Sequence, residues 1–399
     1  MRAEVTRILV LSNLYPPHAI GGYEHTCRDV VRRLRARGHV VDVLTSSWRS
    51  PDAEDEGSDA GVRRELLLTS TFVPPRPRFQ RWSVERSNLR RLRERLAAFR
   101  PDVVSIWNMA GLSLALLVPL VRSRLPLIYV ISDDWPVDCV ARDPWMSAFQ
   151  SRRGLGRAVT RWTGVPTSLP DIDGSGVFVF NSEFLRDDVR ARSAWSFTDS
   201  TVARPGIDRD DFPLVDPEVR HPFVGRLLYV GRLDRTKGIE TLVRALALLP
   251  PLMTLDIVGH GATEYTTSLD HLVAELGLTD RARRRVEPRR RLAQLYRAAD
   301  VCVFPSEWDE PFGLVPLEAM ACGTPVVATG TGGSAEYLRD GYNCLLFPAG
   351  DPEALAARVL ALSGDEPLRR RLGRNGVETA SALTIDTLAD RLEVLHTQT

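Results

Sequence analysis

The sequence predicts an α/β protein of two domains, each built around a doubly wound parallel sheet. Near the start, an apolar run at 8–11 is followed by a glycine loop, a helical pattern that ends at Gly38 and a second apolar run at 40–44. This order of strand, glycine loop, helix and strand opens a doubly wound sheet, whose ligands bind at the carboxyl ends of the strands. A second unit of this kind begins at 226–230, and 399 residues suffice for two separate cores.

Further elements follow in order along each predicted domain. Apolar runs bounded by glycine, proline and polar residues predict buried strands, and apolar residues at helical spacing predict helices. The expected strands are 103–106, 127–131, 177–180 and 201–203 in the first domain, and 255–258, 301–304 and 326–328 in the second. The expected C-terminal helices lie near 352–362, 366–380 and 384–396.

The stretch 302–333 has the features of a binding site for an anionic ligand. Its first strand leads into a loop that carries Glu310, and a helix begins at Leu314 and stops at Gly323. A second strand then runs into the glycine loop 330–333. Backbone N–H groups at a helix N-terminus point outward, and the helix dipole favours negative charge.

Glu310 and Glu318 lie eight residues apart across this stretch. Eight residues of helix span roughly 12 Å, whereas the two carboxyl groups of a glycosidase lie roughly 5 to 9.5 Å apart. The pair is therefore poorly placed to act on one bond. Two interpretations stay open: each carboxylate accepts hydrogen bonds from a different ring of one long ligand, such as a nucleotide sugar, or one caps the helix and the other lies on its solvated face.

Composition excludes several classes of protein. The net charge of +1 argues against nucleic acid as the main partner. The five cysteines form no CxxC pair, which argues against a disulfide framework or a zinc site. The start lacks the apolar stretch of a signal peptide, and the apolar run 114–118 is too short to span a bilayer. We therefore expect a cytoplasmic protein, monomeric or homodimeric.

Residues 76–100 predict a helix rich in arginine, with Trp82, Leu89, Leu92 and Leu96 on its apolar face. A basic amphipathic helix of this kind can lie on an anionic membrane. The alternative is an ordinary solvated surface helix. We therefore expect at most a weak membrane contact through this segment.

The stretch 302–333 resembles the signature of the retaining glycosyltransferases of family 4 (glycosyl transferases group 1), which have the GT-B fold and carry a Glu-x7-Glu motif. The positions that match family positions are Pro305, Ser306, Glu310, Phe312, Gly313, Glu318, Ala319, Met320, Ala321, Gly323, Pro325, Val326, Val327, Gly332, Gly333 and Glu336. The loops 21–24, 205–208 and 231–238 also resemble the family's glycine loop, hinge and phosphate loop. The sequence departs from the family at Cys344, where glycine is usual, and at Ser132, where many members have histidine.

The resemblance implies a GT-B architecture of two Rossmann-like domains that face each other across a cleft. Residues 1–205 would form the acceptor-binding domain, and 206–383 the domain that binds the nucleotide sugar. The helix in 384–399 would cross back to the first domain.

The resemblance also implies the reaction, which is transfer of a sugar from a nucleoside-diphosphate sugar to an acceptor hydroxyl or amine with retention of configuration. A UDP-sugar is favoured and a GDP-sugar is the alternative; no metal ion or other cofactor is expected. The acceptor, which stays unidentified, could belong to secondary-metabolite, glycolipid or polysaccharide biosynthesis. The implied catalytic residues are Arg232, Lys237, Glu310 and Asp133; the donor-binding residues are Gly22, Arg232, Lys237, Glu310, Phe312, Gly313, Leu314 and Glu318; the acceptor-binding residues are Gly21, Glu24 and Asp133.

Three competing interpretations remain. The first is an NAD-dependent dehydrogenase, because the loop 330–333 mimics part of a dinucleotide-binding fingerprint. That fingerprint needs an acidic residue at the end of a second strand about 20 residues later, and the nearest, Asp351, begins a helix instead. Asp171 and Asp173 fit the DxD motif of metal-dependent glycosyltransferases, although no apolar strand precedes them. A catalytically impaired GT-B protein that only binds nucleotide sugars is the third. The departure at Ser132 keeps it open, and the presence of Arg232, Lys237, Glu310 and Glu318 argues against it.

Overall fold

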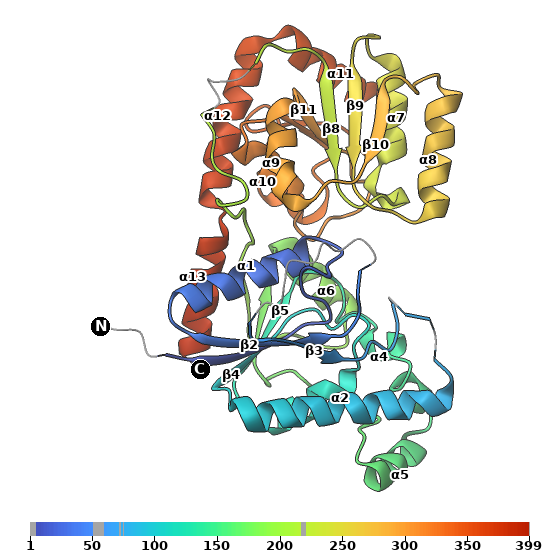
Figure 1. Cartoon of the computed structure of the whole chain (residues 1–399), viewed down its shortest axis with the longest axis vertical. Helices are drawn as coiled ribbons and strands as arrows, with labels where there is room; N and C mark the ends of the chain where they lie inside the picture. The colour runs from blue at the N-terminus through green and yellow to red at the C-terminus, as the bar shows by residue number, and fades with distance from the viewer. Residues whose placement is uncertain (1–4, 51–59, 72, 75, 217–220, 399) are drawn as a thin grey trace. The chain divides into compact units, whose positions relative to one another are not determined.

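The computed structural model describes residues 5–50, 60–71, 73–74, 76–216 and 221–398. The chain divides into two compact units (Figure 1). Unit 1 comprises Met1–Ala203 and Leu388–Thr399, and unit 2 comprises Arg204–Thr387. The division after Ala203 lies two residues before the predicted boundary.

Unit 1 contains a seven-stranded sheet in the order β3-β2-β1-β4-β5-β6-β7, and every pair of neighbouring strands is parallel. The strands are β1 (Arg7–Leu11), β2 (Val40–Ser46), β3 (Val62–Leu66), β4 (Val103–Ile106), β5 (Leu127–Ile131), β6 (Val177–Phe180) and β7 (Ser200–Val202). Because the strand order reverses on either side of β1, the sheet is doubly wound, as predicted. The sheet's carboxyl edge therefore gathers the loops that follow β1, β4, β5 and β6.

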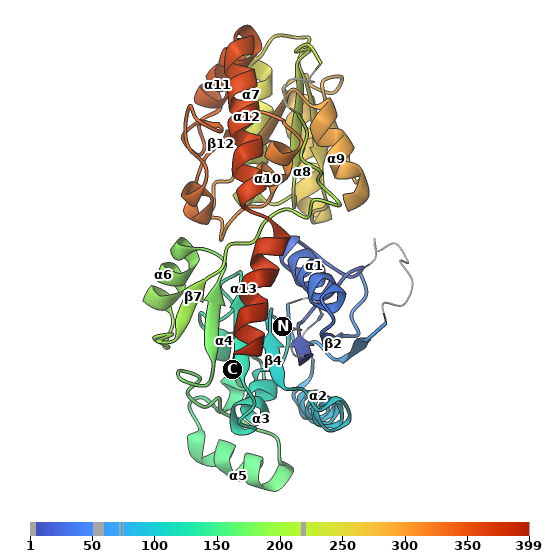
Figure 2. The ribbon, with the colours of Figure 1, turned by 90° about the vertical axis from the view of Figure 1, so that its left-hand side faces the viewer.

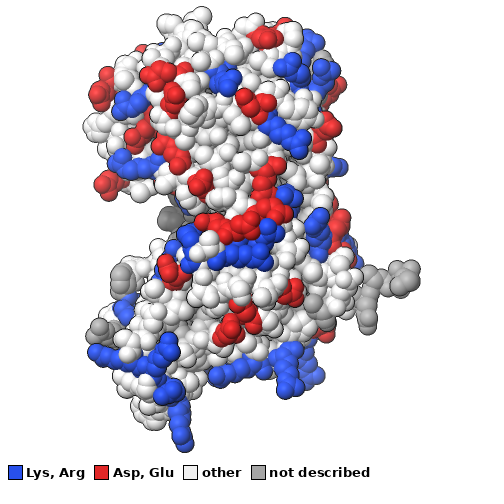
Figure 3. All heavy atoms as spheres, turned by 180° about the vertical axis from the view of Figure 1, so that it is seen from behind, with Lys and Arg blue, Asp and Glu red and all other residues white. Residues whose placement is uncertain are grey.

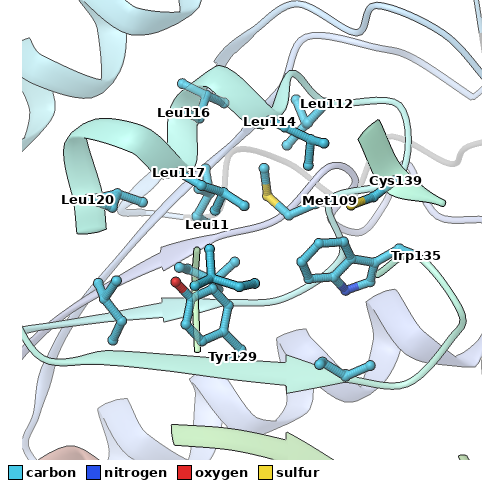
Figure 4. Packing of buried hydrophobic residues seen from close by; sticks show 14 of the residues in the cluster. Leu11, Met109, Leu112, Leu114, Leu116, Leu117, Leu120, Tyr129, Trp135 and Cys139 are labelled. Atoms are coloured by element: carbon cyan, nitrogen blue, oxygen red, sulfur yellow. The ribbon is translucent and has the colours of Figure 1, made fainter. Parts of the chain in front are cut away.

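Helices and short 3-10 turns connect these strands. They are α1 (Gly22–Ala36), α2 (Arg78–Phe99), α3 (Leu117–Arg122), α4 (Cys139–Arg142), α5 (Arg153–Thr163) and α6 (Glu183–Arg192). The core of unit 1 forms where the leucine-rich segment before and within α3 covers one face of the sheet. Figure 4 shows Leu114, Leu117 and Leu120 above the strand residues Leu11 and Tyr129.

Unit 2 contains a six-stranded parallel sheet in the order β10-β9-β8-β11-β12-β13. Its strands are β8 (Arg226–Val230), β9 (Thr254–Val258), β10 (Ala282–Arg285), β11 (Val301–Phe304), β12 (Val326–Ala328) and β13 (Leu345–Leu346). Its helices are α7 (Ile239–Leu248), α8 (Thr263–Glu275), α9 (Arg289–Ala298), α10 (Val315–Ala321), α11 (Pro352–Gly364) and α12 (Glu366–Ala382). Each unit thus has its own doubly wound parallel sheet, which confirms the predicted fold class.

The last helix, α13 (Ile385–Thr397), lies against unit 1 although it follows unit 2 in sequence (Figure 2). Arg37 forms ion pairs of 2.6 Å with both Asp390 and Glu393. The Nε2 atom of His39 lies 2.9 Å from Glu393, and Leu392 is fully buried. These contacts hold the end of the chain to unit 1.

The sequence missed three of the four strands at the sheet edges; the fourth, β7, was expected at 201–203. β3, β10 and β13 are outermost in their sheets, and the first two carry the sequences VRREL and ARRR. An edge strand buries less of its surface than a central strand and often carries charged side chains, so it lacks the apolar run that marked the other strands. Within the described residues, no helix has the length and apolar character needed to cross a membrane.

Candidate active site

The loop after β8 is positioned by Gly259, which has no room for a side chain. Gly259, which follows β9, has a φ of +155°, and a Cβ there would lie 1.8 Å from the carbonyl oxygen of Gly231. Leu233 donates its N–H to the carbonyl of His260 over 2.6 Å. The turns after β8 and β9 are therefore locked together, and they present Arg232 at the carboxyl edge of the sheet.

Asp234 organises the cationic part of this loop. Its carboxylate accepts the N–H of Thr236 at 3.0 Å, which starts the 3-10 turn Arg235–Lys237, and it pairs with the Nε atom of Arg232 at 2.7 Å. Burial raises the pKa of Asp234, but the hydrogen bonds from Thr236 and Arg232 outweigh it and hold that pKa below its usual value. The Arg232 side chain stays half-exposed and can reach a ligand.

Lys237 is held between a carboxylate and an aromatic ring. Its Nζ atom lies 2.6 Å from Oε1 of Glu310 and 4.7 Å from the centre of the Trp308 ring. An ammonium group has three N–H donors, so the ion pair with Glu310 still leaves donors for a ligand. The next residue, Gly238, has a φ of +64°, and a Cβ there would lie 1.9 Å from the carbonyl oxygen of Pro305. Close backbone packing therefore fixes the position of Lys237.

Glu310 is buried among groups from three segments. Besides Lys237, its Oε1 atom accepts the hydroxyl of Ser306 at 2.8 Å, and its backbone carbonyl accepts the N–H of Gly333 at 2.6 Å. Gly332, with a φ of +59°, passes so close that a Cβ would lie 2.5 Å from the same carbonyl. The glycine loop 330–333 thus supports the loop that carries Glu310.

The backbone of Phe312, Gly313 and Leu314 leads directly into α10, which starts one residue after the predicted position. Gly313 has a φ of +82°, and its carbonyl accepts the hydroxyl of Tyr337. The rings of Phe312 and Tyr337 lie 5.2 Å apart. Tyr337 thereby fixes the turn before α10.

Glu318, on α10, is buried in a different environment from Glu310. Its Oε2 atom accepts the hydroxyl of Tyr296 at 2.9 Å, and its Oε1 atom lies 3.6 Å from Nη1 of Arg289. Burial, followed by the charge of Glu318, raises the pKa of Tyr296 well above its usual value. Because the two glutamates contact different side chains, each can bind a different part of one ligand.

In unit 1, polar residues follow four parallel strands. They are Asn13 after β1, Asn108 after β4, Asp133 after β5 and Asn181 after β6. Asn108 donates its amide N–H to Asp133 at 3.0 Å. Burial, with the charges of Asp134 and Glu24, raises the pKa of the half-buried Asp133 to about 7, against the lowering effect of hydrogen bonds from Trp135 and Asn108.

The glycine loop of unit 1 is shaped by Glu24. Gly21 is the N-cap of α1 and Gly22 its first residue, and the Glu24 carboxylate accepts the N–H of Gly21 at 2.9 Å. The hydroxyl of Tyr23 donates to the carbonyl of Val130, at the end of β5. Gly21, Gly22 and Glu24 therefore lie at the same edge of the sheet as Asp133, but Glu24 is engaged in holding its own loop.

Sequence reasoning singled out Arg232, Lys237, the two glutamates and Asp133 but missed several residues around them. These are Asn13, Tyr23, Asn108, Arg289, Tyr296, Trp308 and Tyr337. The asparagines could have been found, because each directly follows a predicted strand. The side chains around Glu318 and Lys237 could not, because their contacts join residues far apart in sequence.

The DxD motif and the glycine loop 330–333 have structural roles that do not fit a metal site or a dinucleotide site. Asp173 accepts the N–H groups of Ser196 and Phe197, both at 2.8 Å, so it ties down a loop. The glycine loop 330–333 leads into a single 3-10 turn, Gly332–Glu336, instead of a long helix. Asp351 caps α11. Neither the DxD motif nor the dinucleotide fingerprint has the strand and helix context that it requires.

The chain is similar to known proteins over most of its length. The family described as "Glycosyl transferases group 1" matches residues 225–379, and "Glycosyltransferase Family 4" matches residues 20–211. The glycogen synthase of Mycobacterium tuberculosis is 30% identical over 406 residues, which cover 92% of this chain and 88% of the relative. A D-inositol 3-phosphate glycosyltransferase of Corynebacterium jeikeium is 29% identical over 404 residues, which cover 94% of this chain and 91% of the relative.

A solved structure shows the same fold. HepE of Anabaena, in complex with UDP, is similar with a TM-score of 0.71 at 20% identity, over 97% of this chain and 98% of that chain. The likeness therefore extends over both units.

Proposed function

Since the chain belongs to glycosyltransferase family 4, with the two parallel α/β domains of the GT-B class, we propose that it transfers a sugar from a nucleoside-diphosphate sugar to an acceptor hydroxyl with retention of configuration. A UDP-sugar is the favoured donor, since a structure of the same fold was solved with UDP. The two relatives named above act on inositol phosphate and glycogen by name, so a polyhydroxylated acceptor is favoured over an amine.

The observation that carries this proposal is the cluster of Lys237, Glu310 and Arg232 at the carboxyl edge of the unit 2 sheet. The difficult part of the reaction is the departure of the diphosphate, which concentrates negative charge. Lys237 and Arg232 both lie close to Asp234, and the turns around them are fixed by close backbone packing. Cationic groups held in place before the reaction stabilise the leaving group without further reorganisation.

The two glutamates would hold different parts of the donor. Glu310, paired with Lys237, would orient the sugar hydroxyls beside the diphosphate. Glu318, with Tyr296 and Arg289, would grip the ribose. On this proposal, the oxygens of Glu310 that Lys237 does not occupy accept hydrogen bonds from the sugar hydroxyls.

Unit 1 would supply the groups that orient the acceptor. Asp133, with its pKa near 7, would accept a hydrogen bond from the acceptor hydroxyl, and Gly21 and Gly22 would present backbone N–H groups. A phosphate oxygen of the donor would take the proton of the attacking hydroxyl. Glu24 would act indirectly, through the loop that it caps.

Calorimetric titration with UDP and GDP tests whether Glu310 and Glu318 bind different parts of the donor. We expect Glu318→Ala to weaken nucleoside-diphosphate binding by roughly 1.5 to 3 kcal/mol, the value of a buried hydrogen bond to a charged group. Glu310→Ala should leave that affinity nearly unchanged and lower turnover. The exposed Glu366→Ala is the matched control, and equal losses of affinity at positions 310 and 318 would refute the assignment.

We further propose that no metal ion takes part. This rests on the cationic loop 232–237 and on the structural use of Asp173. Activity should survive an excess of EDTA, and Asp171→Ala should have little effect. Loss of turnover with EDTA and recovery with manganese would contradict this.

The alternative is a protein that binds nucleotide sugars without turning them over, which the departure at Ser132 favours. Hydrolysis of UDP-, GDP-, ADP- and TDP-sugars by the wild-type chain separates the two. Tight binding with no hydrolysis and no transfer would favour the alternative.

A further inference from the structure

Helix α5 of unit 1 exposes large apolar side chains to solvent. Trp162 is 89% exposed and Leu155 is 52% exposed. With the exposed Ala158, these residues lie at positions i, i+3 and i+7 of one helix and so share a face. In both ribbon views α5 lies at the end of unit 1, below the sheet (Figures 1 and 2).

The opposite face of α5 is already packed against its own unit. Gly156 is buried so tightly that a Cβ would lie 2.8 Å from the Thr167 hydroxyl. Thr160 and Thr167 share a hydrogen bond of 2.9 Å, and Val159 packs against the cluster formed by Leu89, Trp145 and Val165. One face of the helix is therefore packed against unit 1, and Trp162 is exposed on a helix that is held in place.

The same segment is strongly basic. Residues 144–170 contain no Asp or Glu and four arginines, namely Arg152, Arg153, Arg157 and Arg161. All four are exposed, and none of them forms an ion pair within the described part of the chain. Their charge is thus available to a partner.

Helix α2 adds further positive charge beside α5. Arg81 of α2 donates to the carbonyl of Pro144 at 3.0 Å, and Leu89 shares the cluster that anchors α5. Arg86, Arg90 and Arg93 of α2 are exposed. Figure 3 shows blue side chains gathered at the lower end of unit 1 in that view.

We propose that α5, with the neighbouring arginines of α2, forms a docking surface for an anionic lipid bilayer. Trp162 and Leu155 would enter the interface between headgroups and acyl chains, where the amphipathic indole ring is favoured. The arginines would bind the anionic headgroups. This inference does not depend on the proposed reaction.

The structure also changes the role that the sequence suggested for α2. Leu89 and Leu92, which were expected to supply an apolar face to a membrane, are buried in the core of unit 1. α2 can therefore offer a bilayer only its charges. The apolar contact comes from α5, which the sequence did not single out.

Charge favours a bilayer over a second copy of this chain. Two copies that met through this surface would bring two sets of four arginines together, and residues 144–170 hold no acidic side chain to pair with them. Like charges brought into contact oppose association. Anionic lipid neutralises the arginines while the apolar residues are buried.

Co-sedimentation of the full chain with vesicles tests the proposal. We expect binding to phosphatidylcholine vesicles that contain phosphatidylglycerol, little binding to pure phosphatidylcholine, and weakening by salt. Trp162→Ala should lower the partition coefficient by about tenfold, equivalent to about 1.4 kcal/mol. Each of Arg157→Ala and Arg161→Ala should lower it by about fivefold. Leu252→Ala, at an 87% exposed leucine of unit 2, is the matched control and should change nothing.

A second measurement reports insertion directly. All five native cysteines are buried, so Trp162→Cys and Leu252→Cys can each be labelled selectively with an environment-sensitive dye. The dye at position 162 should shift to the blue with anionic vesicles, and the dye at 252 should not. Equal binding to neutral and anionic vesicles, no shift at position 162, or self-association abolished by Trp162→Ala in the absence of lipid would each overturn the proposal.

Discussion

Lys237 is the only lysine in the chain, where the other 51 of 52 basic residues are arginine. A chain that uses arginine almost everywhere keeps lysine at the position that pairs with Glu310 and faces Trp308. A compact ammonium fits between the carboxylate and the ring, whereas a planar guanidinium is larger and directs its donors differently.

We predict that Lys237→Arg lowers turnover by at least about tenfold, or about 1.4 kcal/mol. The matched control is Arg235→Lys, two residues earlier in the same turn, whose exposed side chain makes a 3.3 Å ion pair with Glu240. Exposed pairs contribute little, so this control should retain activity within about twofold. Steady-state kinetics of both variants decides the matter, and full activity in Lys237→Arg would contradict the prediction.

Because Lys237 carries the only ε-amino group, chemical labelling gives an independent check. An amine-selective reagent at high pH should modify Lys237 and the chain's α-amino group only. Labelling at Lys237 should abolish activity, and bound nucleoside diphosphate should protect against it. Retained activity in protein that peptide mapping shows to be labelled at Lys237 would rule out the role.

At the scale of elements, the site depends on loops that pack backbone against backbone at glycine residues. Gly238, at the start of α7, has a φ of +64°, and a Cβ there would lie 1.9 Å from the carbonyl oxygen of Pro305. Gly277, at the end of α8, has nearly the same φ of +68°, but nothing lies within 4 Å of a Cβ there. An alanine at Gly277 would therefore meet only backbone strain, whereas an alanine at Gly238 would meet the same strain and a steric clash.

We predict that Gly277→Ala destabilises unit 2 by about 1 to 2 kcal/mol through the left-handed backbone alone. Gly238→Ala should cost roughly 1 to 3 kcal/mol more, because the loop must move to make room. Urea denaturation followed by circular dichroism measures both values. Nucleoside-diphosphate affinity should fall only in Gly238→Ala; equal effects of the two variants would show that the contact with Pro305 is unimportant.

At the scale of the whole molecule, the end of the chain is part of the first domain. His396 of α13 is buried in unit 1, and burial, followed by the nearby His39, lowers its pKa to about 4. The folded state therefore binds fewer protons than the unfolded state between this value and the ordinary histidine pKa of about 6.5. Stability from the neutral ring is complete above about pH 6.5 and is lost as the pH falls toward 4.

We predict that His396→Phe removes this acid-dependent loss, which amounts to about 3 kcal/mol at most. Seven of the eight tryptophans lie in unit 1 and only Trp308 lies in unit 2, so tryptophan fluorescence during denaturation reports mainly on unit 1. The exposed His271→Gln is the control and should leave the pH dependence unchanged. An unaltered acid slope in His396→Phe would show that α13 does not dock through a neutral histidine.

The sequence by itself determined the doubly wound class, the central strands, the C-terminal helices and the glycine turns. These features are local: apolar periodicity marks a central strand or a helix, and glycine marks a turn that another backbone approaches. It also pointed to Arg232, Lys237, Glu310 and Glu318, because matching residues stand at fixed spacings in family 4.

Only the tertiary structure decided which side chains meet. Lys237 and Glu310 are 73 residues apart in sequence, and Tyr296 and Glu318 are 22 apart. Such contacts depend on how strands and helices are placed against one another, which local periodicity does not encode. For the same reason the structure assigned the apolar face of α2 to the core and left that of α5 in solvent: a helix pattern shows that an apolar face exists, and only packing shows what covers it.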